Sequence, residues 1–202
     1  ETDTIRTRAP EDESLPPVIP LHDPPADVLD ALSPAPHFPS RSILTRAFLE
    51  QHVAPLLEQG DSDLLSAIFQ ATREELRWKR SGKSLVLDVL RRRRTKRIGM
   101  ERTFTTFLRC ARIPARFVEG INLRKSTKRK RVFWTELWAQ DAWWPVSVSQ
   151  QWIGEKPAAY VALSASGRRM LQLSPELTGT YAVQAHRLPS PTPSVTVEGQ
   201  GQ

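Results

Sequence analysis

Residues 107–120 decide the fold of this chain, and they read Phe-Leu-Arg-Cys-Ala-Arg-Ile-Pro-Ala-Arg-Phe-Val-Glu-Gly. Before Ile113 the apolar residues recur at helical spacing, and after Pro114 the period shortens to that of a β-strand. Because proline cannot continue a helix, the change falls at Pro114. The stretch therefore predicts a helix over 100–110 followed by a strand over 116–122.

Upstream of this junction the sequence predicts further helices. A first strong helix begins after Pro39, and a second runs through Leu76 to Trp78, with both side chains pointing inward. A third spans 84–90 and leads into four consecutive arginines. The expected N-caps are Ser40 or Ser42 for the first helix and Asp61 or Ser62 for the second. A short helix over 25–32 is also expected.

Downstream of the junction the sequence predicts antiparallel strands. The polar, basic loop 123–130 separates the first two strands and predicts a hairpin. After 116–122, the expected strands are 131–139, 143–149, 158–163, 168–173 and 180–186. Helices first and antiparallel strands second indicate an α+β domain, with N-terminal helices packed on an antiparallel sheet.

The two ends of the chain differ from its middle. Residues 1–39 are rich in proline and acidic, and we expect an extended arm; 40–188 form the domain, and 189–202 form a flexible tail. Residues 1–30 carry a local charge of −6 within a chain of net +7, so the body attracts anions. The chain does not begin with Met, and we expect it to be a piece of a longer protein.

A second motif follows the first at a fixed spacing. It runs Val-Phe-Trp-Thr-Glu-Leu-Trp over 132–138 and, after a short turn, Ala-Trp-Trp-Pro-Val-Ser over 142–147. Together with 107–120, it resembles the core of the transglutaminase-like superfamily, which has a papain-like fold. The resemblance covers roughly residues 84–150 and implies a transglutaminase-like core here.

The resemblance also implies which positions would hold a catalytic triad. The residues at those positions here are not cysteine, histidine and aspartate. The nucleophilic cysteine falls without gaps on Arg97, or with a shorter helix among Gly99, Met100 and Glu101. The remaining two positions are Val132 for the general-base histidine and Ser147 for the orienting aspartate. An isopropyl group accepts no proton and a hydroxyl carries no charge, so we expect a pseudoenzyme rather than an enzyme.

The one cysteine, Cys110, leaves an alternative open. A cysteine peptidase or acyltransferase working through Cys110 is the second hypothesis. Against it, Cys110 ends its helix, where the helix dipole disfavours a thiolate. The histidines form no close pair and no Cys-x-x-Cys occurs, so we expect no metal and no cofactor.

The binding residues expected from the retained scaffold line a vestigial cleft. They are Arg116, Trp134, Glu136 and Trp143, with Glu136 pairing with a basic group such as Arg116. We expect a protein or peptide partner, with acidic peptides among the candidates.

Two basic clusters are separate candidates for binding. The expected patch comprises Arg91, Arg92, Arg93, Arg94, Arg124, Lys125, Lys128, Arg129, Lys130 and Arg131. Anionic lipid headgroups, an acidic peptide and the acidic arm of the chain all fit such a patch. A nucleic-acid-binding module is the third functional hypothesis, but no nucleic-acid-binding motif accompanies the clusters.

Loss of the triad with retention of the fold is similar to one bacterial family of inactive transglutaminase-like domains. Its members are fused to seven transmembrane helices, and the domain lies outside the cytoplasmic membrane. The resemblance implies a periplasmic location, with membrane attachment through regions outside this chain. It also implies a ligand-binding, peptide-binding or sensory role.

Overall fold

The computed structural model describes residues 26–59, 63–122 and 130–170. The chain divides into two units, Glu1–Gln172 and Leu173–Gln202, and every described residue lies in the first. The expected strand over 180–186, the tail over 189–202, the first 25 residues of the arm and the loop residues 123–129 lie outside the described residues. Within the described part, no helix is long and apolar enough to span a bilayer.

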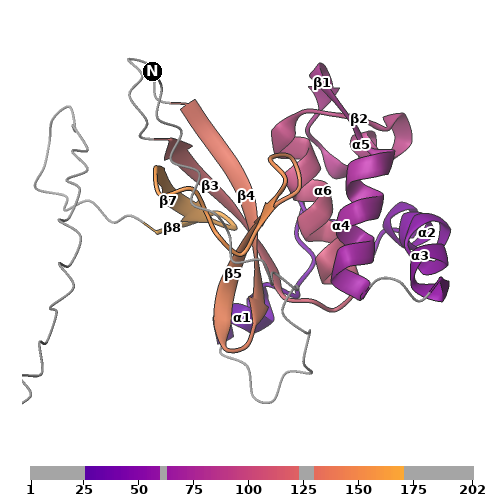
Figure 1. The fold of residues 1–202 in the computed structure, drawn as a ribbon, viewed down its shortest axis with the longest axis horizontal. Coiled ribbons are helices and arrows are strands. Elements are labelled where there is room, and N and C mark those ends of the chain that lie inside the picture. The colour runs from indigo at the N-terminus through magenta and orange to yellow at the C-terminus, as the bar shows by residue number, and fades with distance from the viewer. Residues whose placement is uncertain (1–25, 60–62, 123–129, 171–202) are drawn as a thin grey trace, which may run out of the picture. The chain divides into compact units, whose positions relative to one another are not determined.

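The first described half of the chain is mostly helical, as Figure 1 shows. Its helices are α1 (Ala26–Asp30), α2 (Ile43–His52), α3 (Ala54–Glu58), α4 (Leu64–Glu75), α5 (Val86–Arg92) and α6 (Arg97–Cys110). Ser42 caps α2, as expected, by accepting a hydrogen bond from the Leu44 backbone N–H. The cap of α4 is Asp63 rather than Asp61 or Ser62, because the Asp63 side chain accepts from the Ser66 N–H at 2.9 Å.

Helix α4 ends earlier than the sequence predicts. Leu76 is buried as expected, but Trp78 lies in strand β1 (Arg77–Lys83) and is 55% exposed. Strand β1 pairs in parallel with β2 (Arg94–Thr95), which follows α5. The Arg77 N–H donates to the Arg93 carbonyl at 3.0 Å, so pairing with the segment after α5 draws the chain out of the helix. The inward orientation predicted for Trp78 is therefore wrong.

Helix α6 is the central helix of the fold. It begins at Arg97, three residues before the predicted start, so Gly99 lies inside the helix. Residues 99–109 of α6 are buried except for Arg102. The helix ends at Cys110, and Pro114 leads directly into strand β3 (Ala115–Asn122). The junction predicted from residues 107–120 is confirmed.

The strands form one antiparallel six-stranded sheet in the order β6-β5-β4-β3-β7-β8. The remaining strands are β4 (Lys130–Ala139), β5 (Ala142–Ser147), β6 (Trp152–Ile153), β7 (Tyr160–Ala165) and β8 (Arg168–Arg169). In Figure 1 the long strands lie on one side and helices α2 to α6 on the other. The α+β class, with helices packed on an antiparallel sheet, is confirmed.

Side chains alternate between two apolar clusters across strand β4. Leu137 joins the main core with Phe104, Phe107 and the other residues of the helical layer. Trp134 lies on the other face and packs with Val118 and Ala165 in a smaller cluster. Because successive residues of a strand point to opposite faces, the clusters mark the two sides of the sheet.

The segment 26–39, the last part of the expected arm, packs on the folded body. Val28, Ala31 and Phe38 are buried, with at most 6% exposure. The Ala115 N–H donates to the Ala31 carbonyl at 3.2 Å. Burial of three apolar side chains and a backbone bond to β3 hold this segment on the domain.

Candidate functional site

A fully buried carboxylate lies one turn into α6, where that helix meets the end of β5. Glu101 Oε1 accepts a hydrogen bond from Ser147 Oγ at 2.7 Å and another from the Ser149 N–H at 2.9 Å. Thr135 Oγ1 lies 3.4 Å from Glu101 Oε2. Glu101, Ser147 and Thr135 are each 0% exposed. A charged group thus replaces apolar packing between helix and sheet at this point.

Burial dominates the electrostatics of Glu101. Removal from water raises the pKa of Glu101 to about 7, although the hydrogen bonds from Ser147 and Ser149 favour the ionised form. Burial thus moves the titration of Glu101 from the acidic range toward neutral pH. No described Lys or Arg forms an ion pair with Glu101.

The structure brings together only some of the positions that the resemblance assigned to a triad. Ser147 contacts Glu101, one of the places allotted to the cysteine. Arg97 is exposed at the first position of α6, whereas Met100 is buried. Val132 is half-buried and packs with the Trp134 cluster, on the sheet face opposite to Thr135. Strand β4 contacts Glu101 through Thr135 and not through Val132.

The four residues predicted for the vestigial cleft do lie together. Arg116 donates from Nε to Glu136 Oε2 at 2.7 Å, and Trp134 Nε1 donates to Glu136 Oε1 at 3.0 Å. The Arg116 guanidinium lies 4.0 Å from the ring centre of Trp143. The predicted pairing of Glu136 with Arg116 is confirmed. Trp134 is 0% exposed, so these groups satisfy one another, and ligand binding by them stays a prediction.

Cys110 lies at the opposite end of α6 from Glu101. Nine residues separate it from Glu101, or about 14 Å along a helix axis. Burial raises the pKa of the Cys110 thiol, Arg46 opposes the shift and Glu50 adds to it. Its charged neighbours are thus on α2, and no described histidine is in hydrogen-bond contact with it.

Comparison with known proteins agrees with this geometry. The family model described as the transglutaminase-like superfamily matches residues 51–148. The chain contains a transglutaminase-like domain. A solved structure of a proposed cysteine protease from Cytophaga hutchinsonii matches with a TM-score of 0.57 at 15% identity. The match covers 73% of this chain and 50% of that chain, so the two share the fold while this chain spans half of the other protein's length.

A second solved structure, described as a TGase, matches more weakly. Its TM-score is 0.42 at 15% identity, with coverage of 56% of this chain and 32% of that chain. A similarity this low does not establish a shared fold. No curated protein matches the chain.

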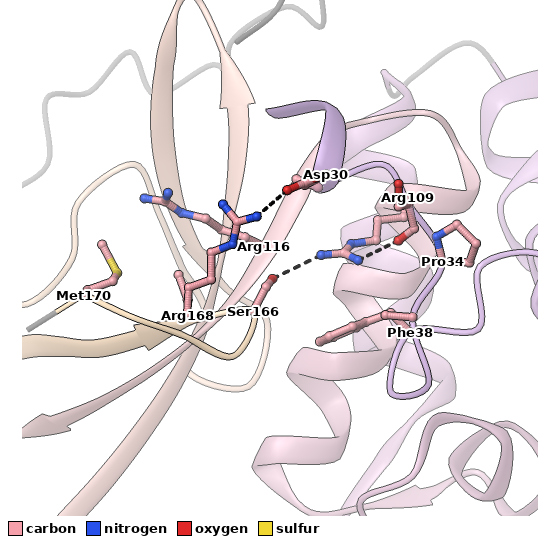
Figure 2. Close-up of a pocket in the computed structure, with 12 residues that line it drawn as sticks. Asp30, Pro34, Phe38, Arg109, Arg116, Ser166, Arg168 and Met170 are labelled. Atoms are coloured by element: carbon pink, nitrogen blue, oxygen red, sulfur yellow. Dashed lines mark hydrogen bonds and ion pairs between the residues drawn. The ribbon is translucent and has the colours of Figure 1, made fainter. Parts of the chain in front are cut away.

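A pocket of about 340 Å³ opens on the transglutaminase-like domain at the junction of α6, β3 and segment 30–38. Figure 2 shows three arginines in its lining, Arg109, Arg116 and Arg168, with one carboxylate, Asp30. Arg168 pairs with Asp30 at 2.5 Å, and both side chains are exposed. Sequence reasoning missed Arg109, Asp30 and Arg168, because only the fold brings 30–38 beside the β7–β8 turn.

Arg109 of this pocket is a buried cation with neutral partners. It donates to the carbonyl of Ala115 at 2.8 Å. It also donates to the carbonyl of Ser33 at 2.8 Å and to Ser166 Oγ at 3.1 Å (Figure 2). Burial lowers the pKa of Arg109 to about 10. The guanidinium also lies 4.6 Å from the ring centre of Phe38. Arg109 therefore fastens segment 33–38 to the domain and gives the pocket a positive wall.

The predicted basic patch is rearranged by the fold. Arg91, Arg92 and Arg94 are exposed, as are Lys130 and Arg131 on β4, whereas Arg124, Lys125, Lys128 and Arg129 lie outside the described residues. Arg93 differs from its exposed neighbours in this cluster. It adopts φ 54°, is half-buried over the Phe48 ring at 4.5 Å, and contacts His52 Nε2 at 3.0 Å. Arg131 is paired with Glu119 at 3.0 Å.

The fold adds strand β1 to the first basic cluster. Pairing of β1 with β2 places Arg77 opposite Arg94 and Trp78 opposite Thr95. We call the result the basic surface. It consists of the exposed residues Arg77, Lys79, Arg80 and Lys83 of β1 with Arg91, Arg92, Arg94, Lys96 and Arg97. Sequence reasoning missed the β1 residues because it placed the start of this strand in a helix.

Among the residues described, no cluster of three or more His, Cys, Asp or Glu side chains is placed to hold a metal ion.

Proposed function

We propose that the transglutaminase-like domain is non-catalytic and serves as a ligand-binding, peptide-binding or sensory module. The observation that carries this proposal is the hydrogen bond between Ser147 and Glu101. In a working triad the position of Ser147 orients an imidazole; here its hydroxyl is buried against a carboxylate. Arg97 and Val132 supply neither a thiol nor a base at the other two positions.

The retained scaffold supports a binding role for the domain. The Arg116–Glu136 pair and the tryptophans that contact it link strands β3, β4 and β5. The nearby pocket offers about 340 Å³, three arginines and a single acidic group. Such a lining favours a ligand that carries a carboxylate together with some apolar surface, which agrees with an acidic peptide.

The part of the proposal that concerns location rests on the resemblance alone. We propose that the domain lies outside the cytoplasmic membrane of a bacterium, as part of a protein with transmembrane helices. Phosphatase and fluorescent-protein fusions at the domain of the full-length gene product test this. Phosphatase activity with no fluorescence is expected, and the reverse pattern excludes an extracytoplasmic domain.

A turnover assay tests the absence of catalysis. The purified chain is incubated with a fluorogenic peptide mixture and with an amine donor for transamidation, beside an active cysteine protease. We expect rates equal to those of a Cys110→Ser variant. A rate above background that is lost in Cys110→Ser supports the cysteine peptidase or acyltransferase alternative instead.

A binding assay tests the ligand role of the pocket. Acidic peptides are titrated against the chain, its Arg168→Gln variant and an Arg112→Gln control. Arg112 is exposed and absent from the pocket lining. Saturable binding that Arg168→Gln weakens by about tenfold, with the control unchanged, is expected for loss of one charge-assisted contact. Absence of saturable binding at physiological salt counts against the ligand role.

A further inference from the structure

The nine cations of the basic surface have no carboxylate partner among the described residues. The span 77–97 contains a single acid, Asp88, which is half-buried in α5. A solvated protein face ordinarily mixes both signs of charge, so a patch of one sign this dense is unusual.

The backbone holds several of these cations next to one another. Arg77 lies opposite Arg94 in the register of β1 and β2, and the Lys96 N–H donates to the Lys83 carbonyl at 2.9 Å. Like charges placed opposite each other in strands are destabilising. Lys96 and Arg97 also stand at the N-terminal end of α6, where the helix dipole is positive. An anionic partner offsets this repulsion.

Two glycines fix the basic surface to α6. A Cβ at Gly82 comes within 2.4 Å of the Thr95 carbonyl carbon, and one at Gly99 within 2.5 Å of the Lys83 carbonyl oxygen. Only a residue without a side chain allows these close approaches. Strand β1 is therefore packed tightly on β2 and the start of α6, and it presents its charges on a rigid element.

An exposed indole stands among the charges. Trp78 is 55% exposed, and because side chains alternate along β1, the exposed Arg80 two residues further on is expected on the same face of the strand. Leu85, at the start of α5, is 53% exposed. Tryptophan partitions to the headgroup region of bilayers, and clustered cations near a membrane surface attract anionic lipids. An exposed tryptophan within a patch of one sign fits a planar anionic interface.

A single-stranded nucleic acid fits the same surface less well. Proteins that hold single strands use a groove and several aromatic platforms. Here the exposed aromatic of the basic surface is Trp78 alone among the described residues. Neither described pocket is lined by a residue of β1.

We propose that the basic surface docks on the anionic headgroups of a phospholipid bilayer, with Trp78 entering the headgroup layer. This contact does not depend on the non-catalytic role proposed above. The domain itself then contacts the membrane directly, in addition to any membrane attachment through other regions of the protein. The surface ends at Arg97, the position that the resemblance gives to a nucleophilic cysteine.

Co-sedimentation with vesicles tests the proposal. The chain is mixed with vesicles of phosphatidylcholine alone, or of phosphatidylcholine with about 30% phosphatidylglycerol, at about 0.15 M and 0.5 M salt. Binding is expected only with the anionic vesicles and only at the lower salt. Brominated lipids are expected to quench part of the tryptophan emission in the parent chain, and this quenching is lost in Trp78→Ala.

Matched double variants locate the contact. Arg77→Gln with Arg80→Gln removes two cations from β1, whereas Arg41→Gln with Arg73→Gln removes two exposed arginines elsewhere. Each cation near an anionic surface contributes about fivefold to partitioning, so the β1 pair is expected to lower binding about 30-fold. The control pair is expected to change it less than threefold, and circular dichroism checks that both variants fold.

Three outcomes overturn the proposal. The first is equal binding to neutral and anionic vesicles, and the second is an equal loss of binding in both double variants. The third is tighter binding to oligonucleotides than to vesicles at the same phosphate concentration, which assigns the basic surface to nucleic acid.

Discussion

Glu101 makes the stability of the domain depend on pH in an unusual direction. Its folded pKa, about 7, lies above its ordinary value of 4.5, because burial penalises the charged form. Between these values the folded chain holds more protons than the unfolded chain. The free energy of unfolding therefore falls as the pH rises from about 4.5 to about 7, by on the order of 3 kcal/mol from this group.

Replacing Glu101 by Gln tests this linkage. Glutamine keeps the size of the side chain and an oxygen that accepts from Ser147, but it does not titrate. Urea unfolding at pH 5 and pH 7.5 is expected to show a smaller loss of stability with rising pH in Glu101→Gln than in the parent chain.

Glu50→Gln serves as the control for this linkage because Glu50 is exposed on α2. It is expected to keep the pH dependence of the parent chain. If Glu101→Gln keeps it as well, Glu101 is not the titrating group.

The thiol of Cys110 should behave as a structural rather than a catalytic group. Its pKa is raised by burial, and it stands at the C-terminal end of α6, where the helix dipole disfavours a thiolate. Iodoacetamide labelling at pH 7 is expected to be at least about tenfold slower than that of glutathione, and to accelerate only above pH 9. Labelling faster than that of glutathione at pH 7 contradicts this expectation and supports the hypothesis of a reactive, catalytic Cys110.

At the scale of elements, one buried arginine secures the whole segment 26–38. Arg109 donates to Ser33, Ala115 and Ser166, which belong to the segment, β3 and the β7–β8 turn respectively. The segment carries one short helix followed by turns, and its own backbone hydrogen bonds are local, such as that from the Phe38 N–H to the Ala35 carbonyl. Its attachment depends on Arg109 and on burial of Val28, Ala31 and Phe38.

The variant Arg109→Met tests that dependence. It removes the donor from the buried carbonyl of Ala115 and from the part-buried carbonyl of Ser33, so we expect a loss of about 2–4 kcal/mol of stability. Hydrogen exchange at the Ala115 N–H, which bonds to Ala31, should become faster than elsewhere in β3. Arg112→Met, at an exposed site, is expected to change neither quantity. Uniform acceleration across the sheet indicates global destabilisation rather than release of the segment.

The sequence predicts some elements better than others for physical reasons. The α6–β3 junction follows from local signals, namely a helical period, a proline and a strand period, and the structure confirms it. The β1 strand is missed because Arg77 and Trp78 continue the helical pattern, and only pairing with residues after α5 makes them a strand. Glu101 and Thr105 lie on the inward face with Leu108, and this i, i+4, i+7 spacing signals a buried carboxylate. The pocket joins segments far apart in the sequence, such as Asp30 and Arg168, which are 138 residues apart, and no local pattern predicts it.

Acidic and basic side chains are distributed unevenly along the chain, with an excess of acids at its N-terminal end. Residues 1–25 contain six acidic and two basic side chains, for a net charge of −4, within a chain of net +7. A tethered acidic segment lowers the effective positive potential of the body at low and moderate salt.

A chain that lacks residues 1–25 tests this effect. We expect it to bind anionic vesicles about two- to fivefold more tightly than the parent chain at 0.15 M salt. The difference should vanish at 0.5 M salt, where charges are screened within a few ångströms. Equal binding at the lower salt shows that the acidic residues do not compete with the basic surface.

The contact between Ser147 and Glu101 also limits which residue can stand at position 147. An aspartate installed at 147 enters a space with 0% exposure that already holds a carboxylate, whose oxygen now lies 2.7 Å from the hydroxyl. Two acids so close share a single proton, and neither then orients an imidazole well. On the non-catalytic role proposed above, an aspartate at 147 can orient an imidazole only after Glu101 has been replaced, and that replacement brings no activity by itself. A stepwise restoration of a triad here therefore passes through a variant without activity.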